Sequence, residues 1–248
     1  MNSVADHYER LLAERYVWMS GPSFDGKVDE QRSLLQRFGI GNGSGAPALD
    51  LGCGPGFQAI ALADLGFRVA AIDSSEKLLA ELNRRKGNRP IDAIVGDIRE
   101  LARFIAPETI AVAVCLGDTL THLESKPQVW RLFADVHRAL LPGGRFIVGF
   151  RDLSVELTGL DRFIPVRSDA ERIMTCFLDY EEGGERVMVH DLVYERGAGG
   201  GWKLLKSRYP KLRLEPAGIV AEMKAQGFSI SHFEAATGPV LIVAEKAP

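Results

Sequence analysis

Residues 49–73 read LDLGCGPGFQAIALADLGFRVAAID. A short apolar run enters the glycine turn, an apolar helix ends at Gly66, and a second apolar run ends in Asp73. Glycines allow backbone N–H groups to approach a ligand at the start of a helix. In open α/β sheets, such ligands lie beyond the carboxyl ends of the strands. The stretch therefore predicts a strand, a ligand-binding turn and a helix, followed by a second strand.

The same alternation of apolar strands and helices continues to residue 150. Further apolar runs are IDAIVGDI at 91–98, AVAVCLG at 111–117 and RFIVGF at 145–150, and the helical patterns between them cover 74–87 and 129–144. Apolar strands that alternate with helices predict a parallel sheet covered on both faces, with right-handed crossovers.

The flanking segments have different patterns. Residues 3–18 and a second segment around Leu34, Leu35 and Phe38 are predicted helices, and GIGNGSGAP at 39–47 is a predicted flexible loop. Beyond Phe150, the β-rich runs 171–180, 186–196 and 202–209 predict a three-stranded antiparallel meander. A helix at 215–227 and strands at 228–235 and 239–246 follow. We therefore divide the chain into an N-terminal helical lid (1–45), a core (46–150), an antiparallel insertion (151–214) and a closing segment (215–248).

Composition excludes several classes of function. Lys and Arg number 30 against 33 Asp and Glu, a net charge of -3, so nothing indicates a nucleic-acid binder. Three cysteines without a C-x-x-C pair disfavour a disulfide framework or a zinc site, and no bound metal is expected. The charged N-terminus lacks the apolar stretch of a signal peptide, and no segment reaches the length of a membrane span. The expected location is the cytoplasm, without membrane contact.

The glycine spacing separates two classes of cofactor. Gly52, Gly54 and Gly56 are spaced by two, unlike the G-x-G-x-x-G of dinucleotide sites, and Pro55 removes an N–H that a pyrophosphate would use. Asp50 would repel a phosphate but suits a ligand with an ammonium group. Asp73 can accept both hydroxyls of a ribose. An NAD(P)-dependent oxidoreductase is therefore the disfavoured alternative.

Residues 49–73 resemble motif I and the acidic loop of class I S-adenosylmethionine (SAM)-dependent methyltransferases. GDIRE at 96–100, AVAVCLGDTLTHL at 111–123 and HRALLPGGRFIV at 137–148 resemble later motifs of that family in the same order. The resemblance covers about residues 45–150, and the closing segment fits it in topology. It implies a Rossmann-like, doubly wound, mostly parallel seven-stranded sheet that binds SAM and releases S-adenosylhomocysteine.

The resemblance also implies roles for the cofactor residues. Asp50 and the loop Gly52–Gly56 would lie along the methionine part, Asp73 would bind the ribose and Asp97 would accept from the adenine amino group. A loop-capping carboxylate is the alternative for Asp97, and a packing helix is the alternative for the lid. The remaining expected cofactor contacts are Tyr16 and Trp18 in the lid, Cys53 as a small loop filler, and Ser74, Leu78, Ile98 and Leu116.

CLGDTLTHL at 115–123 resembles the fourth-strand motif of small-molecule N-methyltransferases, including the glycine N-methyltransferase branch. Asp118 stands where that branch usually has Asn, and a carboxylate there could attract an amine or accept its proton. We expect Asp118 and His122 to orient or deprotonate the acceptor. The alternatives are a turn or N-cap role for Asp118 and a core or helix-start role for His122.

Arg151, in FRDL at 150–153, resembles the arginine that helps to hold a substrate carboxylate in the same branch, although Asp152 departs from the usual Asn. A surface ion pair is the alternative for Arg151. In the insertion, the candidate substrate contacts are Arg167, His190, Arg208 and Tyr209, with a solvated sheet face as the alternative for each.

The sequence thus predicts SAM-dependent methyl transfer to a nitrogen, or another heteroatom, of a small molecule by in-line displacement. A small-molecule O-methyltransferase and a non-catalytic SAM-binding protein are the alternatives. A nucleic-acid acceptor is disfavoured by the acidic net charge and by CLGD in place of a D/N-P-P-Y/F/W motif. A monomer and a dimer are both compatible with the sequence.

Overall fold

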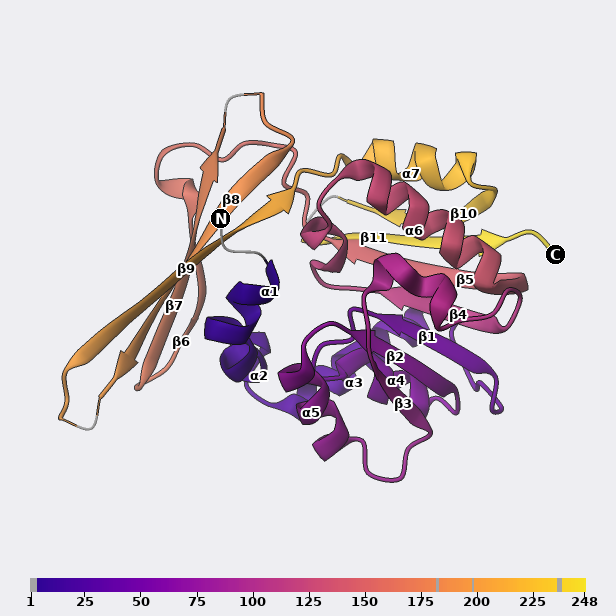
Figure 1. Ribbon diagram of the computed structural model, residues 1–248, viewed down its shortest axis with the longest axis horizontal. Helices are drawn as coiled ribbons and strands as arrows, with labels where there is room; N and C mark the ends of the chain where they lie inside the picture. Colours follow the sequence, from indigo (N-terminus) through magenta and orange to yellow (C-terminus); the bar gives the residue numbers. More distant parts are fainter. Residues whose placement is uncertain (1–3, 182, 198, 236–237) are drawn as a thin grey trace.

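A seven-stranded sheet forms the core of the protein (Figure 1). The computed structural model describes residues 4–181, 183–197, 199–235 and 238–248. The strand order is β10-β11-β5-β4-β1-β2-β3; the last five of these strands are parallel, and β11 and β10 are antiparallel. This architecture confirms the predicted Rossmann-like, doubly wound, mostly parallel sheet. The strands are β1 (Pro47–Leu51), β2 (Arg68–Asp73), β3 (Ile91–Val95), β4 (Ile110–Cys115), β5 (Leu140–Phe150), β10 (Phe228–Glu234) and β11 (Val240–Lys246).

Helices cover both faces of this sheet, because the central strands are apolar on both sides. One buried cluster packs α3 (Phe24–Arg37), α4 (Phe57–Asp64) and α5 (Glu76–Arg85) on one face. A second packs α6 (Lys126–Ala139), α7 (Pro216–Ala225) and the 3-10 turn η3 (Ile98–Arg103) on the other. The helix predicted over 129–144 ends earlier, at Ala139. Leu140–Phe150 is one strand, in which Gly143 adopts a left-handed φ of 74° and the pairing with β4 shifts register.

A second, antiparallel sheet has four strands rather than the predicted three. The extra strand, β6, contains Pro165, and β9 continues through Pro210 beyond the predicted end at residue 209. Both are edge strands, where a missing backbone N–H is tolerated. The elements are the 3-10 turn η5 (Gly159–Arg162), β6 (Phe163–Ser168), β7 (Arg172–Tyr180), β8 (Arg186–Arg196) and β9 (Trp202–Leu212).

The N-terminal segment lies between the two sheets (Figure 1). The single helix predicted over 3–18 is interrupted: α1 (Val4–His7) leads into a π-turn, η1 (Tyr8–Leu12), a 3-10 turn, η2 (Ala13–Arg15), and α2 (Tyr16–Ser20). Leu11 and Leu12 are buried against the apolar inner face of the antiparallel sheet. This segment therefore lies over the carboxyl ends of the core strands. Within the described ranges, no helix is long and apolar enough to cross a membrane.

Candidate active site

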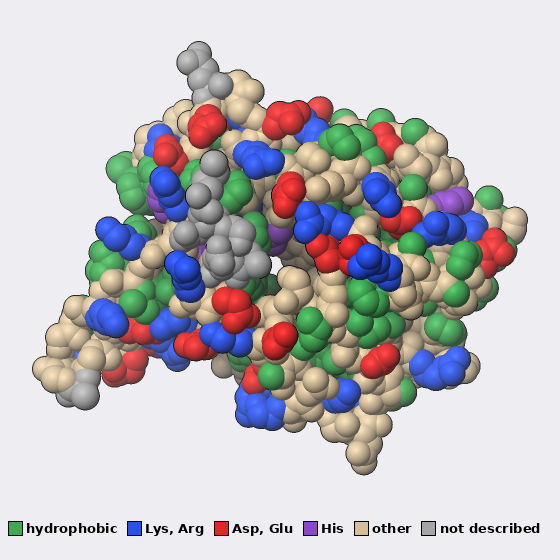
Figure 2. Space-filling view, in the orientation of Figure 1, with side chains coloured by type: hydrophobic (Ala, Val, Ile, Leu, Met, Phe, Trp, Pro, Cys, Tyr) green, Lys and Arg blue, Asp and Glu red, His purple; other side chains and the backbone are tan. Residues whose placement is uncertain are grey.

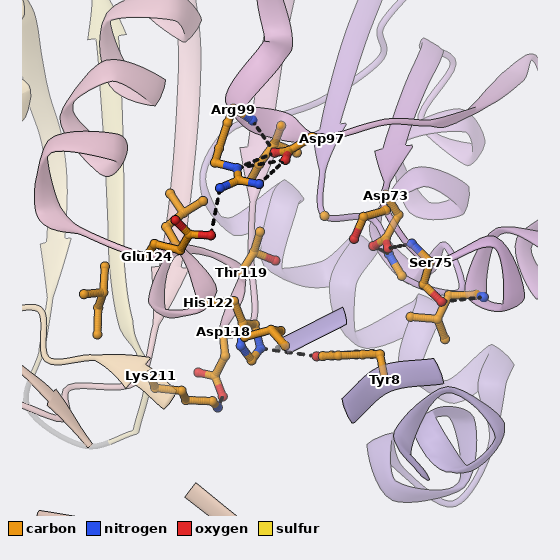
Figure 3. A pocket seen from close by; sticks show the side chains of 18 of the residues that line it. Tyr8, Asp73, Ser75, Asp97, Arg99, Asp118, Thr119, His122, Glu124 and Lys211 are labelled. Atoms are coloured by element: carbon orange, nitrogen blue, oxygen red, sulfur yellow. Dashed lines mark hydrogen bonds and ion pairs between the residues drawn. The ribbon is translucent and has the colours of Figure 1, made fainter. Parts of the chain in front are cut away.

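A cavity of about 380 Å³ lies at the carboxyl ends of β1, β2, β3 and β4. In the space-filling view the molecule is hollowed between the two sheets, and charged side chains surround the opening (Figure 2). The chain crosses from one half of the core sheet to the other between β1 and β4, which is the place where ligands bind in this type of sheet. Tyr8 from the N-terminal segment and Lys211 from β9 close the cavity over these strand ends (Figure 3). Tyr16, also from the N-terminal segment, lines the same cavity.

The glycine loop after β1 forms one wall of the cavity. Gly52 adopts a φ of 68°, and a Cβ added there would lie 2.4 Å from Cγ2 of Thr119, so no other residue fits without displacing Thr119. Gly54 has a φ of 54°, but its nearest neighbour, Cε1 of Tyr16, would be 3.8 Å from an added Cβ. The backbone at Gly54 is therefore open toward the cavity. Gly56 packs against α5 instead and does not line the cavity.

Gly54→Ala is expected to weaken cofactor binding roughly tenfold, because the new methyl group projects toward the cavity. The left-handed backbone alone costs about 1–2 kcal/mol for a residue with a Cβ. Gly117→Ala is the matched control, since Gly117 also has a left-handed φ, of 75°, has open space around it and lies outside the cavity wall. Calorimetric titration with S-adenosylhomocysteine separates the two effects. Equal affinity in both variants would contradict this assignment of Gly54.

Two carboxyl groups lie beside the glycine loop. The carboxylate of Asp73, at the end of β2, accepts from the backbone N–H groups of Gly54 and Ser75, both at 2.8 Å. Burial raises the pKa of Asp73, and these two N–H groups oppose the shift. Asp50 is buried beneath the loop, with 1% of its surface exposed, and Oδ2 has no hydrogen-bond partner within the described residues. Burial, reinforced by the nearby charge of Asp73, raises the pKa of Asp50 to about 8.

Asp97 follows β3 on the neighbouring strand end, where the backbone N–H of Gly96 donates to the Asp73 carbonyl oxygen at 3.0 Å. Its carboxylate accepts from the backbone N–H of Arg99, at 2.9 Å, and so caps the turn η3, as the alternative for this residue predicted. The Arg99 guanidinium also donates to both oxygens of Asp97 and to Glu124 (Figure 3). Although partial burial opposes it, this pairing lowers the pKa of Asp97. Asp97 and Ile98 both line the cavity, so the capping role and an adenine contact are compatible.

Asp118 binds two cations. Lys211 Nζ donates to its Oδ2 at 2.6 Å, and the Arg151 guanidinium donates to the same oxygen, through Nε at 2.9 Å and through Nη2. Although burial alone would raise the pKa of Asp118, Lys211 and Arg151 hold it well below its usual range. The carboxylate caps nothing in the turn η4 (Thr119–His122), so the N-cap alternative is wrong. Its charge is also already paired, unlike the free carboxylate expected for attracting an amine.

Lys211 is a site residue that the sequence interpretation missed. Only 3% of its surface is exposed, and burial lowers its pKa, although the Asp118 carboxylate opposes this shift. Strand alternation was the available signal, because Lys211 follows the buried Tyr209 by two residues and so faces the same side of β9. Because the predicted strand ended at Tyr209, the alternation was not followed beyond that residue.

His122 lies half-buried beside this ion cluster. Its Nε2 lies 3.2 Å from the Tyr8 hydroxyl, and its Nδ1 has no partner among the residues that the structure describes. Burial and the nearby Lys211 lower the pKa of His122 to about 3, so the ring is neutral at neutral pH. Tyr8, which was not among the predicted site residues, is half-buried in the cavity wall, and burial raises its pKa well above the usual value. A neutral histidine and a neutral tyrosine therefore face the cavity together (Figure 3).

Several predicted cofactor contacts lie outside the cavity. Trp18 points to the antiparallel sheet, where its indole N–H donates to Asp169 at 2.6 Å. Leu116 packs against Gly149 in the core, and Cys53 is a buried loop filler whose thiol has a pKa raised well above its usual value by burial. The predicted cofactor residues that line the cavity are Tyr16, Gly52, Gly54, Asp73, Ser74, Leu78, Asp97 and Ile98.

Because side chains alternate along a strand, the predicted substrate residues of the insertion lie on different faces of the antiparallel sheet. His190 and Arg208 are paired on the outer face of the sheet, away from the cavity. Arg208 is exposed there, as the solvated-face alternative states, whereas His190 is half-buried and its Nε2 is shielded from solvent. Arg167 donates to the carbonyl groups of Trp18 and Gly21 and anchors the N-terminal segment. Tyr209 faces inward, stacks on His7 at 4.0 Å and lies 5.6 Å from the His122 ring. Of these four residues, only Tyr209 lies beside the catalytic candidates.

Comparison with known proteins finds methyltransferases. Residues 48–144 match the family model described as a methyltransferase domain. The chain is 31% identical over 163 residues to a glycine/sarcosine N-methyltransferase of Aphanothece halophytica, covering 62% of this chain and 58% of that protein. It is 28% identical over 146 residues to a cypemycin N-terminal methyltransferase of a Streptomyces species, covering 58% of each chain. The matches thus span less than two thirds of these relatives.

The fold is also similar to that of a solved structure along most of its length. A SAM-bound amino pentose methyltransferase from Micromonospora echinaspora, CalS10, superposes with a TM-score of 0.74 at 19% identity. The alignment covers 94% of this chain and 96% of that one. At this level of identity the likeness concerns the fold, including the antiparallel sheet beyond the family match.

Proposed function

We propose that this chain, whose residues 48–144 match the model of a methyltransferase domain, transfers a methyl group from SAM to an amine nitrogen of a small molecule that also carries a carboxylate. The observation that carries the proposal is the cluster of Asp118, Arg151 and the buried Lys211 beside the neutral His122. The cluster itself holds two cations and one carboxylate, so it has an excess of one positive charge. An acidic group on the acceptor would neutralise that charge.

The residues beneath and around the glycine loop fit SAM. The unpaired Oδ2 of Asp50 suits the ammonium group of the methionine part, and the open backbone at Gly54 leaves room for it. Asp73 is held by two backbone N–H groups, and its remaining lone pairs can accept ribose hydroxyls. When bound, SAM supplies a methyl carbon already activated by the adjacent sulfonium. The chain has to orient the acceptor and exclude water.

The charge of the cluster also favours a reactive amine. An amine attacks only through its free lone pair, so it must be unprotonated in the site. Burial and the nearby Lys211, which lower the pKa of His122, also disfavour a protonated amine beside that ring and so promote loss of its proton. His122 and Tyr8, both neutral, can then hold the amine by hydrogen bonds without acting as strong bases.

This electrostatic arrangement supports nitrogen over oxygen as the acceptor atom. A hydroxyl group attacks efficiently only when a base removes its proton, and a histidine with a pKa of about 3 is a weak base at neutral pH. Labelled SAM should therefore give product with small amino acids, less with the matched amines that lack the carboxylate, and none with the matched hydroxy acids. Preferred labelling of hydroxy acids would overturn the nitrogen assignment.

His122→Ala is expected to reduce turnover about tenfold and to leave SAM affinity nearly unchanged, because one neutral hydrogen bond to the acceptor is lost. Arg151→Ala should instead raise KM for the acidic acceptor. Turnover and SAM binding are measured separately for both variants. Unchanged turnover in both would contradict the assignment of these residues to the acceptor.

A further inference from the structure

A second cavity, also of about 380 Å³, adjoins the active site at Lys211. Lys211 belongs to the walls of both cavities, and Arg151 lies in the wall of the second. The two cations that bind Asp118 therefore stand at the boundary between the reaction cavity and a neighbouring space. With the one shared carboxylate they form a cluster with an excess of one positive charge, and Asp152, the other acid in the wall of the second cavity, is exposed to solvent.

The walls of the second cavity are mostly apolar. Leu153 and Leu157 contribute from the loop after β5, and Ile164, Leu178 and Val189 contribute from the inner face of the antiparallel sheet. These side chains belong to the third buried cluster of the protein or pack against it. A space with apolar walls and a cationic end is complementary to a molecule with an apolar group next to an anionic one.

One polar atom in these walls is left without a partner. The hydroxyl oxygen of Tyr180 is buried and makes no hydrogen bond within the described part of the chain. Buried hydroxyl groups are normally paired, so an orphan in a cavity wall indicates an absent partner, either water or a ligand atom. The Cys176 thiol, in contrast, already donates to Asp191 at 2.8 Å.

We propose that the second cavity binds an apolar substituent of the methyl acceptor, whose carboxylate lies between Lys211 and Arg151. The inference rests on the proposed function, and it narrows the acceptor from small acidic amines to those with an alkyl or aryl group. A carboxylate is favoured over a phosphate monoester because a single negative charge matches the net charge of the cluster. The nucleophilic nitrogen then lies on the His122 side of Lys211.

Binding of acids that cannot be methylated on nitrogen tests the subsite independently of catalysis. The protein, loaded with S-adenosylhomocysteine, is titrated calorimetrically with propionate, butyrate, pentanoate and hexanoate, and with hexylamine. Each added methylene buried in the cavity should tighten binding about fourfold, and hexylamine should bind far more weakly than hexanoate. Equal affinity along the series, or equal affinity for hexanoate and hexylamine, would overturn the proposal.

Variants that fill the second cavity provide a second test of the proposal. Ile164→Trp and, independently, Leu157→Trp add bulk at partly exposed positions of the wall and should abolish the dependence on chain length. Ile173→Trp is the matched control, since Ile173 is 40% exposed, on the outer face of the same sheet. A retained chain-length dependence in both cavity variants, with thermal unfolding unchanged, would contradict the subsite.

The two proposals fail in different ways. Tighter binding of longer acids without methyl transfer to any amino acid would leave the subsite standing and remove the nitrogen assignment. Methyl transfer to glycine and to an amino acid with a long apolar side chain at equal kcat/KM, without any chain-length effect on acid binding, would remove the subsite alone.

Discussion

Lys211→Met is expected to lower kcat/KM for an acid-bearing amine about 100- to 1,000-fold. Removing one partner of a buried, hydrogen-bonded charge pair costs about 3–5 kcal/mol. Here the loss also cancels the net positive charge of the cluster, because Asp118 and Arg151 then neutralise each other. Both the binding of the acceptor carboxylate and the lowering of the amine pKa should be weakened. Steady-state kinetics with an amino acid acceptor measure the change.

The control for this variant lies on the same strand. Lys206 is exposed on the outer face of β9, so Lys206→Met should leave kcat/KM within about twofold of the original value. A purely structural role of Lys211 would show in a different way, since kcat/KM would fall by the same factor for amines with and without a carboxylate. A selective loss for the acid-bearing amine supports the proposal, and a uniform loss contradicts it.

The core of the site could be predicted because its residues follow consecutive parallel strands. Gly54, Asp73, Asp97 and Asp118 each come directly after an apolar run, and the carboxyl ends of parallel strands meet at one edge of the sheet. The local order of residues along the chain is therefore enough to bring these side chains together. The resemblance to a known family adds expected roles but not the ion pairs among them.

The other residues of the site could not be predicted, because their positions depend on contacts between segments that are distant in the sequence. Tyr8 reaches His122, 114 residues away, only because the N-terminal segment lies between the sheets. Lys211 reaches Asp118 across 93 residues at the end of an edge strand that continues through Pro210. Proline normally signals the end of a strand, so a pattern-based prediction stops before the lysine. The same limit applies to Asp118. The cations that pair with its carboxylate lie in distant segments, so they cannot be inferred from the sequence around it.

Asp50→Asn is expected to stabilise the ligand-free protein at pH 8 and to weaken its affinity for SAM. In the folded chain Asp50 is protonated up to a pKa of about 8, whereas an unfolded aspartic acid ionises near its ordinary value of about 3.9. Between these two values the folded state holds the extra proton, so the free energy of unfolding falls as pH rises. Below about pH 4 Asp50 is protonated in both states and costs no stability. The free energy of unfolding then falls as the pH rises toward 8, by a total of the order of 5 kcal/mol.

Asparagine removes this dependence because it does not titrate, so the gain in melting temperature should be large at pH 8 and small at pH 4. Asp92→Asn is the control, since Asp92 is exposed on β3. The cofactor should respond in the opposite direction: the ammonium group of S-adenosylhomocysteine favours the carboxylate, so its affinity should rise with pH toward 8 in the original protein and stay lower in Asp50→Asn. A stability loss at pH 8 in Asp50→Asn would mean that the carboxylate is ionised and bonded in the ligand-free state. The expected outcome, higher stability with weaker cofactor binding, would identify Asp50 as a buried acid that the protein keeps for its ligand at the expense of its fold.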